Sequence, residues 1–159
     1  MIETVVDTHV LADLLKQFTF NKPNRQLGET EFLTSNILKK INSSIESNGY
    51  EGSVVTSSFG FVEILNQFEK IRDSRYELSR IIAILRQPPD WFIVEPFTKE
   101  TVYNLIKIPK YNLKGDSIEL ADAIHVATAI QRGPMTYLAT HDGRLKSIDY
   151  VPLKIQLLF

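Results

Sequence analysis

Residues 119–130 read Glu119-Leu-Ala-Asp-Ala-Ile-His-Val-Ala-Thr-Ala-Ile130 and have the spacing of an amphipathic helix. Their apolar side chains recur at steps of three and four and so share one helical face. These are Leu120, Ala123, Ile124, Ala127 and Ile130. Glu119 and Asp122 lie three residues apart beside that face. The small alanine side chains predict that this helix packs closely against a sheet.

Asp122 needs a cationic partner, because an ionised carboxylate on the packed side of a helix is costly without one. No Lys or Arg occurs between Asp116 and Gln131. The partner must therefore come from elsewhere in the fold or be a metal ion. The segment Asp116-Ser-Ile-Glu119 has the form of a capping box, which predicts that the helix begins there and that Glu119 acts first as a capping acid.

The composition is that of a globular protein with a full core. With 159 residues, 43% of them hydrophobic, the chain is expected to form a single domain over residues 1–159. A net charge of -1 gives no general attraction to nucleic acid. The absence of cysteine excludes disulfides, thiolate metal sites and a cysteine nucleophile. Since no signal peptide and no apolar run of about 20 residues is found, we expect a cytoplasmic protein without membrane association.

The rest of the chain alternates β-branched runs with helical patterns. Strands are predicted at Ile2–Val6, Val54–Thr56, Trp91–Glu95, Met135–Ala139 and Leu153–Leu158. Helices are predicted at Thr8–Phe18, Thr30–Ser47, the segment after Ser57 and Ser58 that carries Phe61 to Phe68, Ser74–Gln87 and Thr98–Ile108. This alternation predicts an α/β fold, a three-layer sandwich with a mainly parallel central sheet.

Four acids recur at corresponding places in the strand-helix units. Asp7 and Asp142 follow strands, Glu63 lies about two turns into the helix after the second strand, and Asp122 lies on the helix described first. Ligands of parallel sheets bind outside the carboxyl ends of the strands, so these side chains could meet there. Gathered carboxylates repel one another unless divalent cations neutralise them, and carboxylate oxygens are what Mg²⁺ and Mn²⁺ prefer. Such a site suits phosphodiester chemistry.

The surroundings of these acids resemble the PIN-domain ribonucleases, in particular the toxin nucleases of the VapC type. Val5-Val6-Asp7-Thr8 is similar to the family's opening strand, and Thr56-Ser-Ser-Phe-Gly-Phe-Val-Glu63 to the segment that carries its Glu. Leu120-Ala-Asp122-Ala-Ile-His-Val-Ala-Thr-Ala is similar to the third motif, the most specific of the set. Thr140-His-Asp142 matches the fourth. The resemblance covers nearly the whole chain.

The resemblance implies a PIN-like fold and a Mg²⁺- or Mn²⁺-dependent endoribonuclease. Its catalytic and metal-binding residues would be Asp7, Glu63, Asp122 and Asp142, with Thr140 orienting a ligand or substrate and Glu119 as an auxiliary acid. The family further implies a homodimer and, for a toxin, a cognate antitoxin that inserts a basic side chain among the carboxylates. The chain is longer than a minimal toxin of this type and lacks the basic excess of some members.

Two other functions compete with this one. The first is a PIN-like module that binds RNA or protein through an inactive pocket. The second is a phosphatase of the haloacid dehalogenase type, which is disfavoured because that motif needs a second Asp where this chain has His9. Candidate contacts to RNA are Lys107, Lys110, Lys114, Arg144 and Lys146 for phosphates and Tyr111 for a base. His125 is interpreted as a packed helical side chain.

Overall fold

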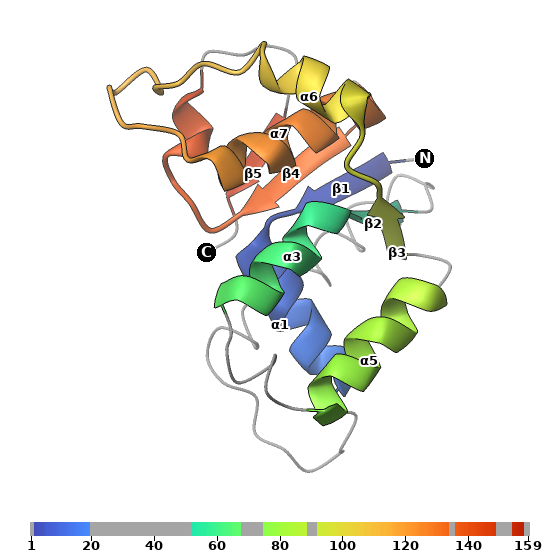
Figure 1. The fold of residues 1–159 in the computed structure, drawn as a ribbon. Helices are drawn as coiled ribbons and strands as arrows, with labels where there is room; N and C mark the ends of the chain where they lie inside the picture. The colour runs from blue at the N-terminus through green and yellow to red at the C-terminus, as the bar shows by residue number, and fades with distance from the viewer. Residues whose placement is uncertain are drawn as a thin grey trace.

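The computed structural model describes residues 2–19, 52–67, 75–88, 92–133, 136–148 and 154–157. Within these residues five strands form one sheet. They are β1 (Ile2–Val6), β2 (Gly52–Ser57), β3 (Phe92–Glu95), β4 (Thr136–Thr140) and β5 (Lys154–Leu157). Their order is β3-β2-β1-β4-β5, and every neighbouring pair is parallel (Figure 1). The predicted α/β arrangement with a parallel sheet is confirmed.

Helices cover both faces of the sheet. They are α1 (Thr8–Thr19), α3 (Ser58–Gln67), α5 (Arg75–Arg86), α6 (Lys99–Leu105) and α7 (Leu120–Arg132), with a 3₁₀ turn η1 at Leu145–Ser147. In Figure 1, α1, α3 and α5 lie on one side of the strands and α6 and α7 on the other. Three layers result, as predicted. The helix predicted at residues 30–47 lies outside the described residues.

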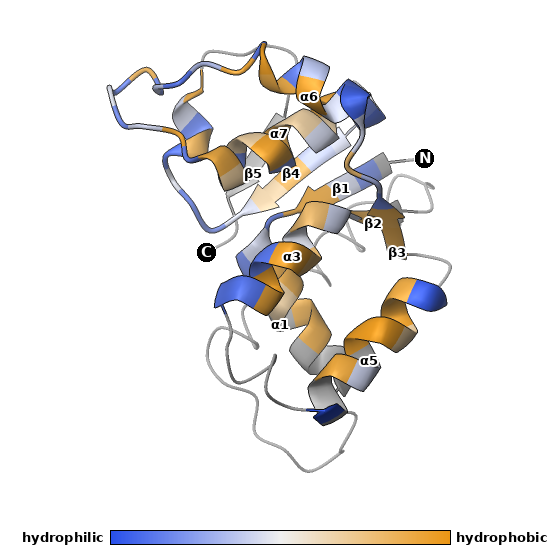
Figure 2. Ribbon diagram, viewed as in Figure 1, coloured by the Kyte–Doolittle hydropathy of each residue, from blue (hydrophilic) through white to orange (hydrophobic). Residues whose placement is uncertain are grey.

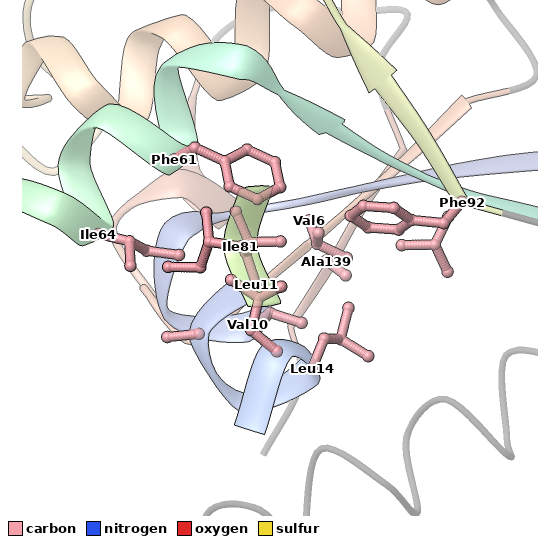
Figure 3. Close-up of a cluster of buried hydrophobic side chains, with 12 residues drawn as sticks. Val6, Val10, Leu11, Leu14, Phe61, Ile64, Ile81, Phe92 and Ala139 are labelled. Atoms are coloured by element: carbon pink, nitrogen blue, oxygen red, sulfur yellow. The ribbon is translucent and has the colours of Figure 1, made fainter. Parts of the chain in front are cut away.

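Alternate residues of β1, β2, β3 and β4 enter two separate cores, because successive side chains of a strand point to opposite faces. Val6 and Ala139 pack with α1, α3 and α5, whereas Val5 and Leu138 pack with α7. Figure 3 shows the first core, in which Phe92 and residues of three helices meet. Each fully buried aliphatic or aromatic side chain contributes about 1.5–3 kcal/mol to folding.

The two cores explain the hydropathy of the elements. Figure 2 shows hydrophobic colours on β3, on α5 and along the middle of α3. Strand β1 is flanked on both sides by strands and covered on both faces, so Val5 and Val6 are completely buried. Near-continuous apolar residues are typical of such a central parallel strand. Among the described residues, no helix is both long and apolar enough to cross a bilayer.

The chain reverses direction across the sheet at β1. From β1 it runs outward through β2 to β3, and then returns to place β4 on the other side of β1. The carboxyl ends of β1 and β4 therefore form the switch point at which ligands of open parallel sheets bind. Asp7 directly follows β1, and Asp142 lies two residues after β4.

The predicted start of the long helix at Asp116 is wrong, since α7 begins at Leu120. The buried side chain of Asn112 organises the preceding loop instead. Its Oδ1 accepts hydrogen bonds from the backbone N–H groups of Lys114 and Asp116, each at 2.9 Å. Asp116 is thereby held in the loop. Glu119 takes the N-cap position through its extended backbone, and its side chain makes no capping hydrogen bond.

Candidate active site

A pocket of about 370 Å³ opens at the switch point. All four acids predicted from the sequence line it, and Glu119 lines it as well. They come from four separate parts of the fold: the end of β1, the helices α3 and α7, and the turn after β4. The other lining residues used below are Thr8, His125 and Arg144. The acids that are remote in sequence therefore face one cavity.

Asp7 lines the pocket and is almost fully buried. Its Oδ1 accepts a hydrogen bond from the backbone N–H of Val10 at 2.8 Å, which caps the first turn of α1. Its Oδ2 accepts one from the Thr140 hydroxyl at 2.6 Å, and the His141 backbone N–H lies at 3.4 Å. Both carboxylate oxygens are thus fixed by the ends of β1 and β4.

Thr140 joins the two strand-end acids. Its hydroxyl donates to Asp7 and accepts a hydrogen bond from the backbone N–H of Asp142 at 2.9 Å. The side chain is completely buried. Thr140 therefore orients the acids themselves.

Glu63 sits in a buried polar network with Thr8 and His125. The Thr8 hydroxyl donates to Oε2 of Glu63, and His125 Nε2 lies 3.2 Å from the same oxygen and 2.9 Å from the hydroxyl. Burial raises the pKa of Glu63, but the hydrogen bonds from His125 and Thr8 and the charges of His125 and His9 outweigh it, so the pKa is lowered overall. Glu63 is thus held as a carboxylate.

His125 is the residue of this network that the sequence interpretation underrated. It is buried as expected for a packed side chain, but it also holds Glu63. Its other ring nitrogen, Nδ1, is buried and has no hydrogen-bond partner within the described part of the chain. The one sequence signal for a place of His125 at the site was its position three residues after Asp122, on the same side of the helix.

The other side of the pocket is a cluster of three acids around Arg144. The guanidinium contacts Asp142 most closely, with Nε and Nη2 at 2.8 and 2.5 Å from Oδ2. Nη2 also lies 3.5 Å from Oδ2 of Asp122, and Nη1 lies 3.4 Å from Oε1 of Glu119. The cation required for Asp122 thus comes from elsewhere in the fold. Arg144, expected among the RNA contacts, is held by carboxylates.

A tight local turn places Arg144 there. Its backbone N–H donates to Oδ1 of Asp142 at 2.8 Å, a side-chain turn typical of Asp. Leu145 follows and is completely buried in the core shared with α7. The buried leucine anchors the turn and directs the arginine side chain back over Asp142.

The two aspartates of this cluster differ in their protonation. Burial and then the charge of Asp142 raise the pKa of Asp122 to about 6, against the opposing charges of Arg144 and His125. Hydrogen bonds from Arg144 lower the pKa of Asp142, against the effect of burial. Of these two aspartates, Asp122 is therefore the less favourably ionised.

The donor set fits a hard divalent cation, because carboxylate oxygens are the ligands that Mg²⁺ and Mn²⁺ prefer. Asp7, Glu63, Asp122 and Asp142 are the residues that would hold it. Over the described ranges, no group of three or more acidic or histidine side chains is already gathered in the geometry of a metal site.

The remaining basic candidates do not line this pocket. Lys107, Lys110, Lys114 and Lys146 are all exposed. The Nζ of Lys107 lies 4.5 Å from the ring centre of Tyr103, and that of Lys110 lies 5.8 Å from the ring of Tyr111. These are short-range cation–π contacts on the surface.

Comparison with known proteins identifies the family. The sequence matches the family model of the PIN domain over residues 4–150. The fold resembles that of the VapBC2 complex from Rickettsia felis bound to a promoter DNA fragment, with a TM-score of 0.60 and 14% identity over 99% of this chain and 100% of that one. It also resembles a toxin-antitoxin complex from Klebsiella pneumoniae, with a TM-score of 0.55 and 15% identity over 98% of both chains. A search of curated proteins finds no match. PIN domains are generally nucleases that depend on divalent metal ions, and this chain belongs to the PIN domain family.

Proposed function

We propose that this protein is an endoribonuclease that hydrolyses phosphodiester bonds of single-stranded or loop RNA with Mg²⁺ or Mn²⁺ and leaves a 5′ phosphate. One observation carries the proposal. Asp7, Glu63, Asp122 and Asp142 come from four separate parts of the fold and line one pocket at the switch point of the sheet. Solubility alone does not require four acids that are remote in sequence to line the same pocket.

The chain's own residues prepare the site in two ways. Thr140 and the start of α1 fix Asp7, and Thr8 with His125 fixes Glu63, so these acids are oriented before any ligand arrives. When bound, a divalent ion polarises the phosphate and makes water a better nucleophile. A pocket lined by acids repels the RNA backbone, so binding of RNA here depends on that positive charge.

The direct test is cleavage of labelled RNA by the purified protein. We expect single-stranded and hairpin RNA to be cut in the presence of Mn²⁺ or Mg²⁺, and cleavage to stop in excess EDTA and return when the ion is restored. A hydrolysed product should carry the 5′ phosphate, which a 5′-monophosphate-dependent exonuclease detects. Cleavage that continues unchanged in EDTA would contradict the proposal. Binding of RNA without cleavage under any metal condition would favour the inactive module.

A toxin role is the second part of the proposal. It is supported by the two solved structures with similar folds, one described as a toxin-antitoxin complex and the other as VapBC2 bound to a fragment of its promoter DNA. We propose that the protein pairs with an antitoxin and forms a homodimer. Induced expression should then arrest growth, and co-expression of the protein encoded by an adjacent reading frame should relieve that arrest.

Replacement of Thr140 tests how the acids are held in place. Thr140→Val keeps the shape but removes the hydroxyl that serves both Asp7 and Asp142. We expect a loss of about 1–3 kcal/mol in the free energy of unfolding, because two buried polar groups lose their partner. Mn²⁺ affinity should fall as well. Thr140→Ser keeps the hydroxyl and should behave nearly as wild type in urea unfolding and in Mn²⁺ titration; equal metal affinity of the Val and Ser variants would argue against this positioning role.

A further inference from the structure

We propose that Arg144 competes with the divalent cation for the carboxylates of the pocket and so sets the metal concentration at which the site fills. This inference rests on the proposed function, because it concerns the same acids. Its evidence is the position of the guanidinium, which reaches three carboxylates of the pocket, on Glu119, Asp122 and Asp142.

The contacts of Arg144 involve the oxygens that a metal ion would need. A single nitrogen, Nη2, lies 2.5 Å from Oδ2 of Asp142 and 3.5 Å from Oδ2 of Asp122. Two cations that share these oxygens would lie within a few ångströms of each other, where their repulsion is strong even at the high effective dielectric of a protein surface. The guanidinium on these oxygens therefore disfavours a divalent ion on the same oxygens, and a divalent ion there disfavours the guanidinium.

The guanidinium can leave without unfolding the chain around it. Its side chain is 39% exposed, and partly exposed ion pairs are weak. The turn is held by other groups, namely the hydrogen bond from the Arg144 backbone N–H to Asp142 and the buried side chain of Leu145. Rotation of the arginine side chain towards solvent breaks neither of them.

Arg132 provides a comparison, because it forms ion pairs between strands and not in the pocket. Arg132 bridges Glu3 on β1 and Glu95 on β3, and its side chain is 26% exposed. Those two carboxylates lie outside the acidic pocket. Arg144, by contrast, is surrounded by acids of the pocket itself. The local turn brings Arg144 to the pocket, and its guanidinium contacts three carboxylates there and joins no strands.

The test is calorimetric titration with Mn²⁺ alone, without RNA, so that binding is measured apart from activity. Arg144→Gln removes the competing charge and should bind Mn²⁺ about 3- to 10-fold more tightly than wild type. Arg144→Lys keeps the charge and should stay closer to wild type. Arg86→Gln, which makes the same chemical change at an exposed position on α5, should leave the affinity unchanged.

A second measurement uses the wild-type protein and does not depend on any variant folding. The ¹⁵N-labelled Nε–H group of Arg144, assigned through bonds from its own backbone in the wild-type protein, should give a slowly exchanging signal while it donates to Asp142. Titration with Mg²⁺, which is diamagnetic, should shift this signal towards that of a free arginine. A signal that does not respond to saturating Mg²⁺ would overturn the inference.

The outcomes separate this inference from the proposed function. If wild type binds Mn²⁺, Asp122→Asn does not, and Arg144→Gln binds with wild-type or lower affinity, the competition is refuted while the nuclease site stands. If neither wild type nor any variant binds Mn²⁺, both are refuted. Tighter binding by Arg144→Gln together with the Mg²⁺-dependent shift would support both.

Discussion

Asp122→Asn is expected to slow RNA cleavage by about 10²–10³-fold, the range seen when one group that stabilises the transition state electrostatically is removed. Asparagine has nearly the same shape but carries no charge, so it neutralises a bound cation poorly. Asp122 lies on α7 with its side chain 19% exposed and faces the pocket beside Asp142. Single-turnover cleavage at fixed Mn²⁺ measures the effect.

A matched control makes the same chemical change outside the pocket. Asp116 is an exposed acid of the loop before α7, and its carboxylate accepts a hydrogen bond from Asn112 that asparagine can also accept. Asp116→Asn should cleave RNA at the wild-type rate. If Asp122→Asn cleaves as fast as this control, the assignment of Asp122 to the site fails.

The same substitution should stabilise the fold at neutral pH. The pKa of Asp122 is raised from 3.8 to about 6, so between these values the folded protein holds a proton that the unfolded chain has lost. The stability contributed by this group is therefore complete at low pH and is lost as the pH rises through about 6. At pH 7.5 the cost of ionising Asp122 is on the order of 2 kcal/mol, which Asp122→Asn removes.

Urea unfolding of both proteins at two pH values checks this. The variant should be the more stable at pH 7.5, and the difference should shrink near pH 4, where Asp122 is protonated in the folded wild type. An equal difference at both pH values would show that the charge of Asp122 is not its cause. Gain of stability with loss of activity is common at functional sites.

Substitutions at Asp7 should separate its two roles. Asn is as good an N-cap as Asp, so Asp7→Asn keeps the acceptor for the Val10 N–H and should cost only about 1 kcal/mol of stability. Asp7→Ala loses this cap and the acceptor for Thr140, and should cost about 2–4 kcal/mol. Both should reduce cleavage by about 10²–10³-fold.

Thermal unfolding and single-turnover cleavage of the two variants give the comparison. Asp116→Ala supplies the control for removal of an exposed carboxylate. An Asp7→Asn protein that is stable and cleaves at the wild-type rate would restrict Asp7 to its capping role. A stable and inactive Asp7→Asn protein would show that the charge, and not the cap, serves the reaction.

Much of this architecture follows from local rules. The strand at Ile2–Val6 has the predicted bounds, and the other strands and helices described by the structure agree with their predictions to within a few residues. Parallel strands end at one edge of the sheet, which was enough to predict that Asp7 and Asp142 lie near each other. The placement of Glu63 and Asp122 around the same pocket follows from helical spacing on elements that pack against that edge.

The errors arise where tertiary contacts overrule local preference. Asp116 has the pattern of a cap, but its backbone N–H donates to the buried Asn112, which is itself held by the backbone carbonyl of Arg144. The sequence predicts Arg144 to be a surface residue that contacts RNA. Its contacts with Asp122 and Glu119 join segments more than twenty residues apart, so local spacing does not reveal them. The closeness of His125 to Glu63 depends on how α7 crosses α3, which spacing along one helix cannot reveal.

The backbone is held differently on the two sides of the pocket, because β1 lies in the middle of the sheet. Asp7 directly follows a strand that is hydrogen-bonded on both sides. We therefore expect local unfolding on this side to require opening of the central sheet. On the opposite side, Asp142 and Arg144 line the pocket just before the short 3₁₀ turn Leu145–Ser147, whose leucine is buried. If Arg144 competes with a cation as proposed, sequence changes confined to residues 143–148 should alter how readily the cavity accepts that cation while the sheet beneath stays intact.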